Sequence, residues 1–267
     1  MKKFLVLLLA LVLVASMVAC NVGGGEQTTE GTTEGTEGTT AGTTAGTTEE
    51  KTTEAETEEQ TPDSAMTYEE YMAAEMDEAV LVEAYVQATQ SWWDNKITVY
   101  LQDKDGGYLA YELTCSEEDA AKLVPGVKIR ISGYKTAWAG EIEIASGATF
   151  VFVEGGDTYV AEPVDLTDVL ANEEELIKYQ NQLAIFKGLT VEAIEYKNGE
   201  PGDDIYVTFK QGDKSFSFCV ERYLTGPETE VYKAFETLKA GDVVDVTGFV
   251  YWYNGINTHI TVITVAE

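Results

Sequence analysis

The chain has 267 residues and a formal net charge of −30, with 47 acidic against 17 basic residues. Residues 67–267 alone carry 36 acidic and 14 basic residues, and no basic run occurs among them. Proteins that bind nucleic acids usually present a basic face to the phosphates, so this balance argues against a polyanionic ligand. The charge favours solubility and repulsion from anionic surfaces.

Residues 1–19 have the pattern of a secretory signal peptide: two lysines, an apolar run over residues 4–14, and small residues before Cys20. The run is short for a membrane-spanning helix. The stretch "SMVAC" resembles the lipobox of bacterial lipoproteins, although Met17 stands where that motif prefers leucine. The resemblance implies a lipid on Cys20 that anchors the protein at the extracellular face of the bacterial cytoplasmic membrane. An uncleaved anchor helix and an ordinary secretion signal are the alternatives.

Residues 20–66 consist largely of Gly, Thr and Glu, as in "GTTEGTEGTTAGTTAG". Almost no large apolar side chain occurs there, so no core can offset the entropy lost on ordering the chain. We expect a disordered linker that holds the folded part away from the membrane.

A first folded domain is predicted over residues 67–163. A short amphipathic segment, "TYEEYMAAEM", precedes three strand-like runs, "AVLVEAYVQAT", "KITVYLQD" and "GYLAYELTC". In the first run Val80, Val82 and Val86 share one apolar face, which predicts a half-buried strand. A helix follows at "SEEDAAKLV", where Ser116 can cap the first turn. The runs "VKIRISGYKTAW" and "EIEIASGATFVFV" predict two closing strands.

Residues 164–267 repeat this order and form the second predicted domain. In the second copy the helix is expected at "GPETEVYKAFETL", with Val231, Phe235 and Leu238 on one face. Two homologous domains of about a hundred residues each follow, which is a normal domain size. A shift of 115 residues superposes Gly126 on Gly241, Gly133 on Gly248, Gly140 on Gly255, Ile131 on Val246, Tyr134 on Phe249 and Trp138 on Tyr253.

Three strands, a helix and two strands is the order of the OB-fold, a five-stranded Greek-key barrel. We therefore predict a mainly β protein with two tandem five-stranded OB-fold barrels, each with a helix between strands three and four. The pattern G-x-x-[IV]-x-[IV]-[ST]-G-[YF] at the fourth strand resembles OB modules of secreted bacterial proteins. Residues 67–267 as a whole resemble the tandem OB-fold lipoproteins of bacteria, a family without an assigned role. The resemblance implies a fold and names no ligand.

Residues for catalysis or metal binding are scarce. His259, the only histidine, lies in a strand-like run without companions that would mark a nucleophile or a metal ligand, so we expect it to be packed. Cys115 and Cys219 each follow a strand-like run, which suggests equivalent places in the two copies, and we expect buried free thiols rather than a disulfide. The stretch "QDKDGG" resembles a calcium loop only faintly and predicts a hairpin turn. We expect no enzyme, no cofactor and no metal.

The adjacent rings of Trp92 and Trp93 cannot both face one core if this stretch is extended. The following Asp-Asn pair at 94–95 favours a two-residue turn that pairs Trp93 with Lys96. In that register Trp92 points into the barrel together with Ala88, and Trp93 points outward beside Lys96.

Aromatic and amide residues gather in two loops of each copy, between strands one and two and between strands four and five. OB-folds use these two loops to frame a groove for oligonucleotides or oligosaccharides. The alternative is that the rings cap the barrel mouths or bury the contact between the domains. The candidate binding residues are Trp93, Lys96, Trp138, Tyr196, Asn198, Tyr251, Trp252, Tyr253 and Asn254.

We expect a non-catalytic binding module on the cell surface that recognises a glycan or a partner protein. Binding of single-stranded nucleic acid would use the same rings for base stacking, but the sequence offers no basic groove for it. A purely structural or assembly protein is a third possibility, and the sequence does not separate it from the first.

Overall fold

The computed structural model describes residues 62–266. The predicted signal peptide, the predicted lipidation site Cys20 and the linker up to residue 61 lie outside the described residues. The described helices are all too short or too polar to cross a membrane.

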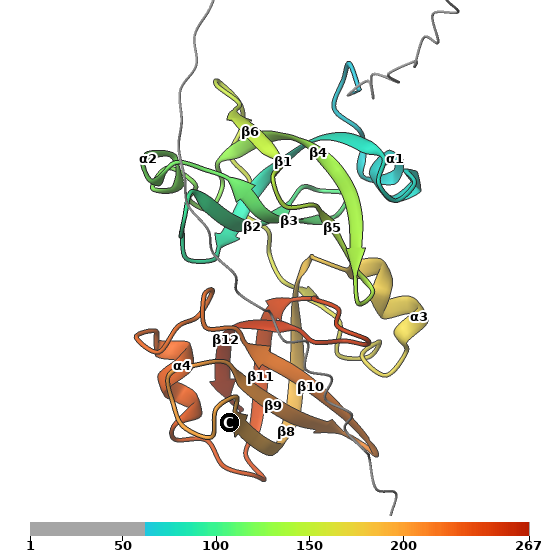
Figure 1. Ribbon diagram of the computed structural model, residues 1–267. Helices are drawn as coiled ribbons and strands as arrows, with labels where there is room; N and C mark the ends of the chain where they lie inside the picture. Colours follow the sequence, from blue (N-terminus) through green and yellow to red (C-terminus); the bar gives the residue numbers. More distant parts are fainter. Residues whose placement is uncertain (1–61, 267) are drawn as a thin grey trace, which may run out of the picture. The chain divides into compact units, whose positions relative to one another are not determined.

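The first sheet closes into a five-stranded barrel (Figure 1). Its strands follow the order β1-β2-β3-β5-β4, and β4 pairs back with β1. β3 and β5 are parallel, whereas the other neighbours are antiparallel. This closed order, with a short helix between β3 and β4, is the OB-fold. The bounds are β1 Ala79–Thr89, β2 Lys96–Gln102, β3 Gly107–Thr114, β4 Lys128–Trp138, β5 Glu141–Ile144 and the additional edge strand β6 Thr149–Phe152.

Alternation along β1 builds the core of this barrel. Val80, Val82, Ala84 and Val86 are fully buried, as the sequence predicts, and they pack with inward residues of β2 such as Leu101. The intervening residues of β1 face outward, so one strand serves the core and the surface at once.

Both helices of the first domain begin at side-chain caps. The helix α1, Tyr68–Ala73, starts at Thr67, which forms a reciprocal capping box with Glu70. The helix α2, Glu117–Ala120, starts at Ser116, whose hydroxyl accepts from the Asp119 amide at 3.1 Å. The predicted cap at Ser116 is therefore confirmed.

The predicted turn at the tip of β1 and β2 is also confirmed. Asp94 and Asn95 have φ angles of 46° and 59°, which two-residue hairpins require at both central positions. Trp93 and Lys96 exchange backbone hydrogen bonds of 3.1 and 2.9 Å. Trp92 packs against the barrel core and Trp93 is 55% exposed, as the register predicts.

Two expectations about this barrel are wrong. A β-bulge between Val86 and Ala88 inserts Gln87 and turns Ala88 away from the barrel core, toward a separate cluster with Tyr100. The last strand is not continuous: residues 145–148 separate β5 from β6, and the two pieces pair with different halves of β4.

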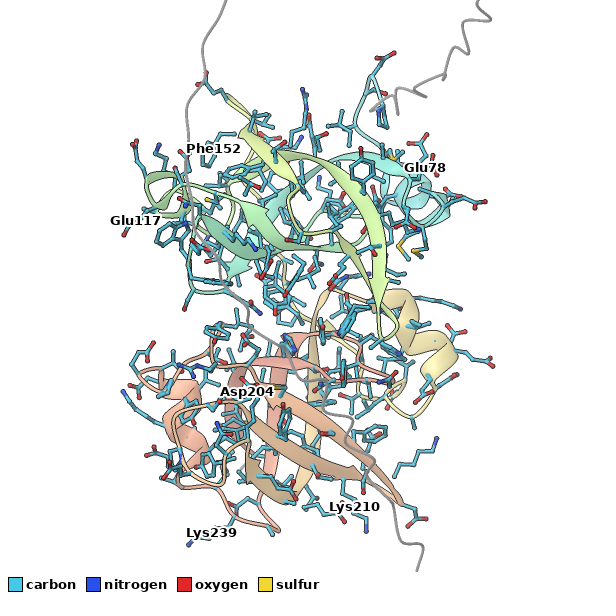
Figure 2. All side chains as sticks on the ribbon, viewed as in Figure 1. Glu78, Glu117, Phe152, Asp204, Lys210 and Lys239 are labelled. Atoms are coloured by element: carbon cyan, nitrogen blue, oxygen red, sulfur yellow. The ribbon has the colours of Figure 1, made fainter. Side chains whose placement is uncertain are left out.

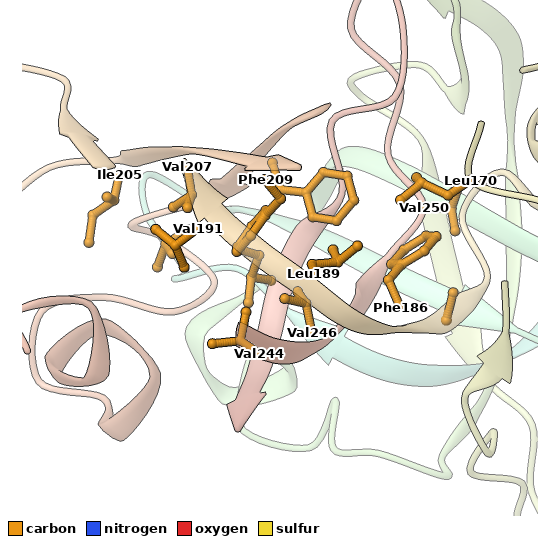
Figure 3. Close-up of a cluster of buried hydrophobic side chains, with 14 of the residues drawn as sticks. Leu170, Phe186, Leu189, Val191, Ile205, Val207, Phe209, Val244, Val246 and Val250 are labelled. Atoms are coloured by element: carbon orange, nitrogen blue, oxygen red, sulfur yellow. The ribbon is translucent and has the colours of Figure 1, made fainter. Parts of the chain in front are cut away.

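The second sheet closes in the same way, in the order β8-β9-β10-β12-β11 with β11 back on β8. β10 and β12 are the parallel pair within this barrel, and β7 adds to β8 in parallel at the edge of the sheet. Its core is aromatic and aliphatic, and Figure 3 shows Phe186, Leu189 and Phe209 at its centre. The bounds are β7 Val164–Asp165, α3 Glu173–Leu176, the 3-10 helix η1 Ile177–Tyr179, β8 Leu183–Tyr196, β9 Ile205–Gln211, β10 Lys214–Val220, α4 Glu230–Phe235, β11 Val243–Phe249 and β12 His259–Val265.

Both described cysteines are buried free thiols, as expected. They do not occupy equivalent places in the two copies, which corrects the sequence expectation. Cys219 pairs with His259 across the parallel strands of the second barrel, and the matching pair of the first barrel is Ala110 with Ile144.

Candidate ligand site between the two barrels

The loop between β11 and β12 meets the tight turn that follows β4. The Asn254 amide donates to the Ala139 carbonyl at 2.7 Å. The Trp252 side chain is only 7% exposed and belongs to the second core. Gly140 has a φ of 96°, and a Cβ there would lie 2.7 Å from Cδ1 of Trp252. Glycine is therefore needed at this position for both conformation and space.

The segment before β8 hydrogen-bonds to the exposed backbone of the first barrel at β5. The Gln180 amide accepts from the Ile142 N–H at 3.0 Å and donates to the Gly140 carbonyl at 2.9 Å. The Asn181 side chain donates to the Ile142 carbonyl at 3.0 Å. These side chains satisfy backbone groups that a strand edge would otherwise leave unpaired.

A third apolar cluster joins the barrels from β2 and β11. The rings of Tyr100 and Phe249 stack with centroids 4.5 Å apart, and Leu109 packs with them. Beside them the Tyr251 ring stacks on His259 at 4.1 Å. Burial lowers the pKa of His259 to about 3, so this imidazole is neutral at physiological pH. His259 is a packed residue, as predicted.

Next to this cluster lies a cavity of about 540 Å³, which we call the main cavity. The carboxylates of Glu112, Asp204 and Glu221 line it, and Asp204 is labelled in Figure 2. Within residues 62–266, no lysine or arginine lines it. Burial raises the pKa of Glu221 to about 7, against the hydrogen bonds it accepts from the backbone. The aromatic residues of its wall are Trp93, Tyr111, Tyr206, Tyr223, Tyr251 and Tyr253.

A second cavity, of about 430 Å³, shares two residues with the main cavity. Its lining consists of Tyr111, Trp138, Glu143 and Tyr251, and we call it the side cavity. Tyr111 and Trp138 come from β3 and β4 of the first barrel, and Tyr251 comes from the second. Three rings therefore stand around one carboxylate.

The alternation of β5 explains why carboxylates lie between the barrels. Ile142 and Ile144 pack on the first core, so Glu141 and Glu143 point the other way. Both are buried, and desolvation raises the pKa of Glu141 to about 8 and that of Glu143 to about 7. Glu141 accepts from the Trp252 amide at 2.7 Å.

The predicted site residues divide into three groups. Trp93, Tyr251 and Tyr253 line the main cavity, and Trp138 lines the side cavity with Tyr251. The others lie outside both cavities: Lys96 binds Glu112 at 2.8 Å, Tyr196 packs on the second core, the Asn198 side chain donates to Asp203, and Trp252 and Asn254 make the contact between the loops.

Several cavity residues were not predicted. Glu143 and Glu221 are the clearest cases, because each lies within a strand or at its end and carries no motif. The "EIEI" alternation does place two carboxylates on one face. It could not reveal that a second barrel covers that face.

No family model and no curated protein matches the chain. The asparaginyl-tRNA synthetase of Pyrococcus horikoshii, solved with asparaginyl-adenylate, is 19% identical over 40% of this chain, with a TM-score of 0.29. The match covers 23% of that synthetase, so the chain spans less than a quarter of its length. A murine DNA-binding protein solved with double-stranded DNA is 12% identical over 70% of this chain and 96% of its own, with a TM-score of 0.35. The OB-fold assignment rests on the strand pairing itself.

Proposed function

We propose that the chain is a lipid-anchored extracellular protein that binds its ligand in the main cavity and catalyses no reaction. The observation that carries the proposal is the lining of that cavity, which has six tyrosine and tryptophan rings and three carboxylates and, among the described residues, no lysine or arginine. A volume of about 540 Å³ is in the range of small-molecule and oligosaccharide sites.

Such a lining suits a glycan or an extended segment of a partner protein. Aromatic faces stack on apolar faces of sugar rings or peptide side chains, and carboxylates accept hydrogen bonds from hydroxyl or amide groups. The main cavity lies beside the loops after β1 and after β11, where OB-folds bind oligomeric ligands.

A glycan array probed with the full chain in a non-ionic detergent tests this proposal. We expect a bound oligosaccharide whose affinity falls at least tenfold in Trp93→Ala and in Tyr253→Ala, since both side chains are more than half exposed and line the cavity. Binding that survives both substitutions would place the ligand elsewhere. If the array shows no bound glycan, the native protein and the same two variants are compared in a pull-down of surface proteins. A partner protein bound in the main cavity should be retained by the native protein and lost in both variants.

Binding of single-stranded nucleic acid is the alternative, because aromatic rings also stack on bases. The lining opposes it, because among the described residues it offers no lysine or arginine to the phosphates, and Lys96 and Lys197 nearby are already paired with Glu112 and Asp204. A gel-shift assay at physiological salt should show no complex. Micromolar binding that weakens steeply with added salt would replace our proposal with this one.

The anchor is tested separately with Cys20→Ser. We expect the native protein to partition with membranes and the variant to appear in the medium, because the lipid would be lost with the thiol. Retention of the variant in the membrane would instead indicate an uncleaved anchor helix.

A further inference from the structure

The side cavity has the composition of an aromatic cage. Trp138 is 62% exposed and Tyr111 is 42% exposed, so two of its three aromatic residues are accessible to solvent. Tyr251 is held in place because it stacks on His259. The three rings come from three separate strands or loops of the two barrels.

Glu143 is the polar member of the cage. Its residue is only 7% exposed, and within residues 62–266 its carboxylate forms no hydrogen bond or ion pair. Burial alone raises its pKa to about 7. A buried carboxylate without a partner is costly, which means that a cation in the cavity would be stabilised strongly.

From this geometry we infer that the side cavity binds an organic ammonium group, with Tyr111, Trp138 and Tyr251 around the cation and Glu143 as its counterion. The inference rests on the proposed function, since it names a chemical group of the ligand held between the barrels. Cations are attracted to the negative faces of aromatic rings, at exposed sites as well as at desolvated ones. Anions are disfavoured by Glu143, and a neutral group gains nothing from its charge.

Two sources offer this chemistry outside a cell. One is a quaternary trimethylammonium head group, as in choline, and the other is the primary ammonium of an amino sugar. Both fit a cavity of about 430 Å³. The main cavity, which shares Tyr111 and Tyr251, would hold the rest of a larger ligand.

Isothermal titration calorimetry with the full chain in a non-ionic detergent without choline groups tests the inference. The probes are choline against its neutral isostere 3,3-dimethylbutan-1-ol, and glucosamine against glucose. We expect at least one ammonium compound to bind tenfold or more tightly than its neutral partner, and the pair that responds identifies the source. Equal binding within both pairs, or no binding of either cation, would overturn the inference.

Variants locate the site. Glu143→Gln keeps the size of the side chain and should abolish the preference for the cation, and Trp138→Ala should weaken binding at least fivefold. Glu162→Gln is the matched control, because Glu162 is exposed and lines neither cavity. Cation binding that Glu143→Gln leaves unchanged would overturn the assignment to this cavity.

The pH dependence of the affinity for choline distinguishes a counterion from a residue with only a structural role. Because the pKa of Glu143 is about 7, affinity for choline should rise from pH 6 to pH 8 as the carboxylate ionises, and this rise should be absent in Glu143→Gln. The inference and the proposed function fail separately: a Trp93-dependent oligosaccharide with no ammonium binding refutes only the cage.

Discussion

The Tyr100 hydroxyl lies 2.6 Å from Nδ1 of His259, and this contact joins β2 of one barrel to β12 of the other. Gln90 donates to the same hydroxyl at 3.3 Å, so the proton of Tyr100 is available for the imidazole. Both side chains are buried, so water does not compete for this hydrogen bond between the barrels.

Tyr100→Phe should lower the free energy of unfolding by about 1–3 kcal/mol, because it leaves Nδ1 of a buried, neutral His259 without its partner. Urea unfolding measures the change. Tyr223→Phe is the control, since Tyr223 is about half exposed and its loss of a hydroxyl should cost almost nothing. Equal stability of the two variants would mean that water satisfies the imidazole.

Gly140→Ala should destabilise the contact with Trp252 by roughly 1–3 kcal/mol, through strain at positive φ and through the clash. Gly147→Ala separates these causes, because Gly147 has a φ of 89° and open space around its Cβ position. We expect the Gly140 variant to be the less stable and to shift the tryptophan emission to longer wavelengths as Trp252 becomes hydrated. Similar stability and emission in both variants would contradict the close approach.

Trp92→Ala and Trp93→Ala should differ in stability. Trp92 packs on the first core and its indole N–H donates to the Cys115 carbonyl at 2.8 Å, so its removal should cost roughly 3 kcal/mol or more. Trp93 is 55% exposed, and its loss should cost less than about 1 kcal/mol. Chemical denaturation of both variants is the measurement. A Trp93 variant as unstable as the Trp92 variant would contradict the outward orientation of its ring.

The buried carboxylates predict how stability depends on pH. Glu143 has a folded pKa raised to about 7, so the native state binds more protons than the unfolded state above the ordinary value of 4.5. Its contribution is therefore fully present below pH 4.5 and is lost as the pH rises through 7. His259 acts in the opposite direction, because its lowered pKa makes acid unfavourable to the folded state.

Comparing the native protein with Glu143→Gln isolates one carboxylate. The free energy of unfolding of the native protein should fall relative to that of the variant between pH 5 and pH 7, by at most about 1.4 kcal/mol per pH unit. Denaturant titrations at pH 5, 6, 7 and 8 provide the comparison. A difference that stays constant with pH would show that Glu143 keeps an ordinary pKa in the folded state.

Local patterns in the sequence predict much of the fold. The Asp94 and Asn95 turn, the cap at Ser116 and the alternation of β1 depend on neighbouring residues, and all three are as predicted. The bulge at Gln87 could not be predicted in this way. An extra residue shifts the alternation by one position, and the apolar residues around it fit the strand pattern both with and without the shift.

The candidate site depends on contacts between residues far apart in the chain, and there the sequence is less informative. Trp252 and Tyr253 are adjacent aromatic residues of one loop, yet only Trp252 is buried against the turn at Gly140. Contacts with the other barrel determine which of these two side chains lines a cavity, and the loop sequence has no periodicity that predicts it.

The hydrogen bond from Asn254 to Ala139 joins positions that the 115-residue repeat superposes. Both residues have positive φ angles, 53° at Ala139 and 56° at Asn254, so one turn meets its own duplicate. Asn254 donates and Ala139 accepts, so the two copies of the turn have different roles in the contact. After duplication, each copy of the turn can therefore diverge toward its own role.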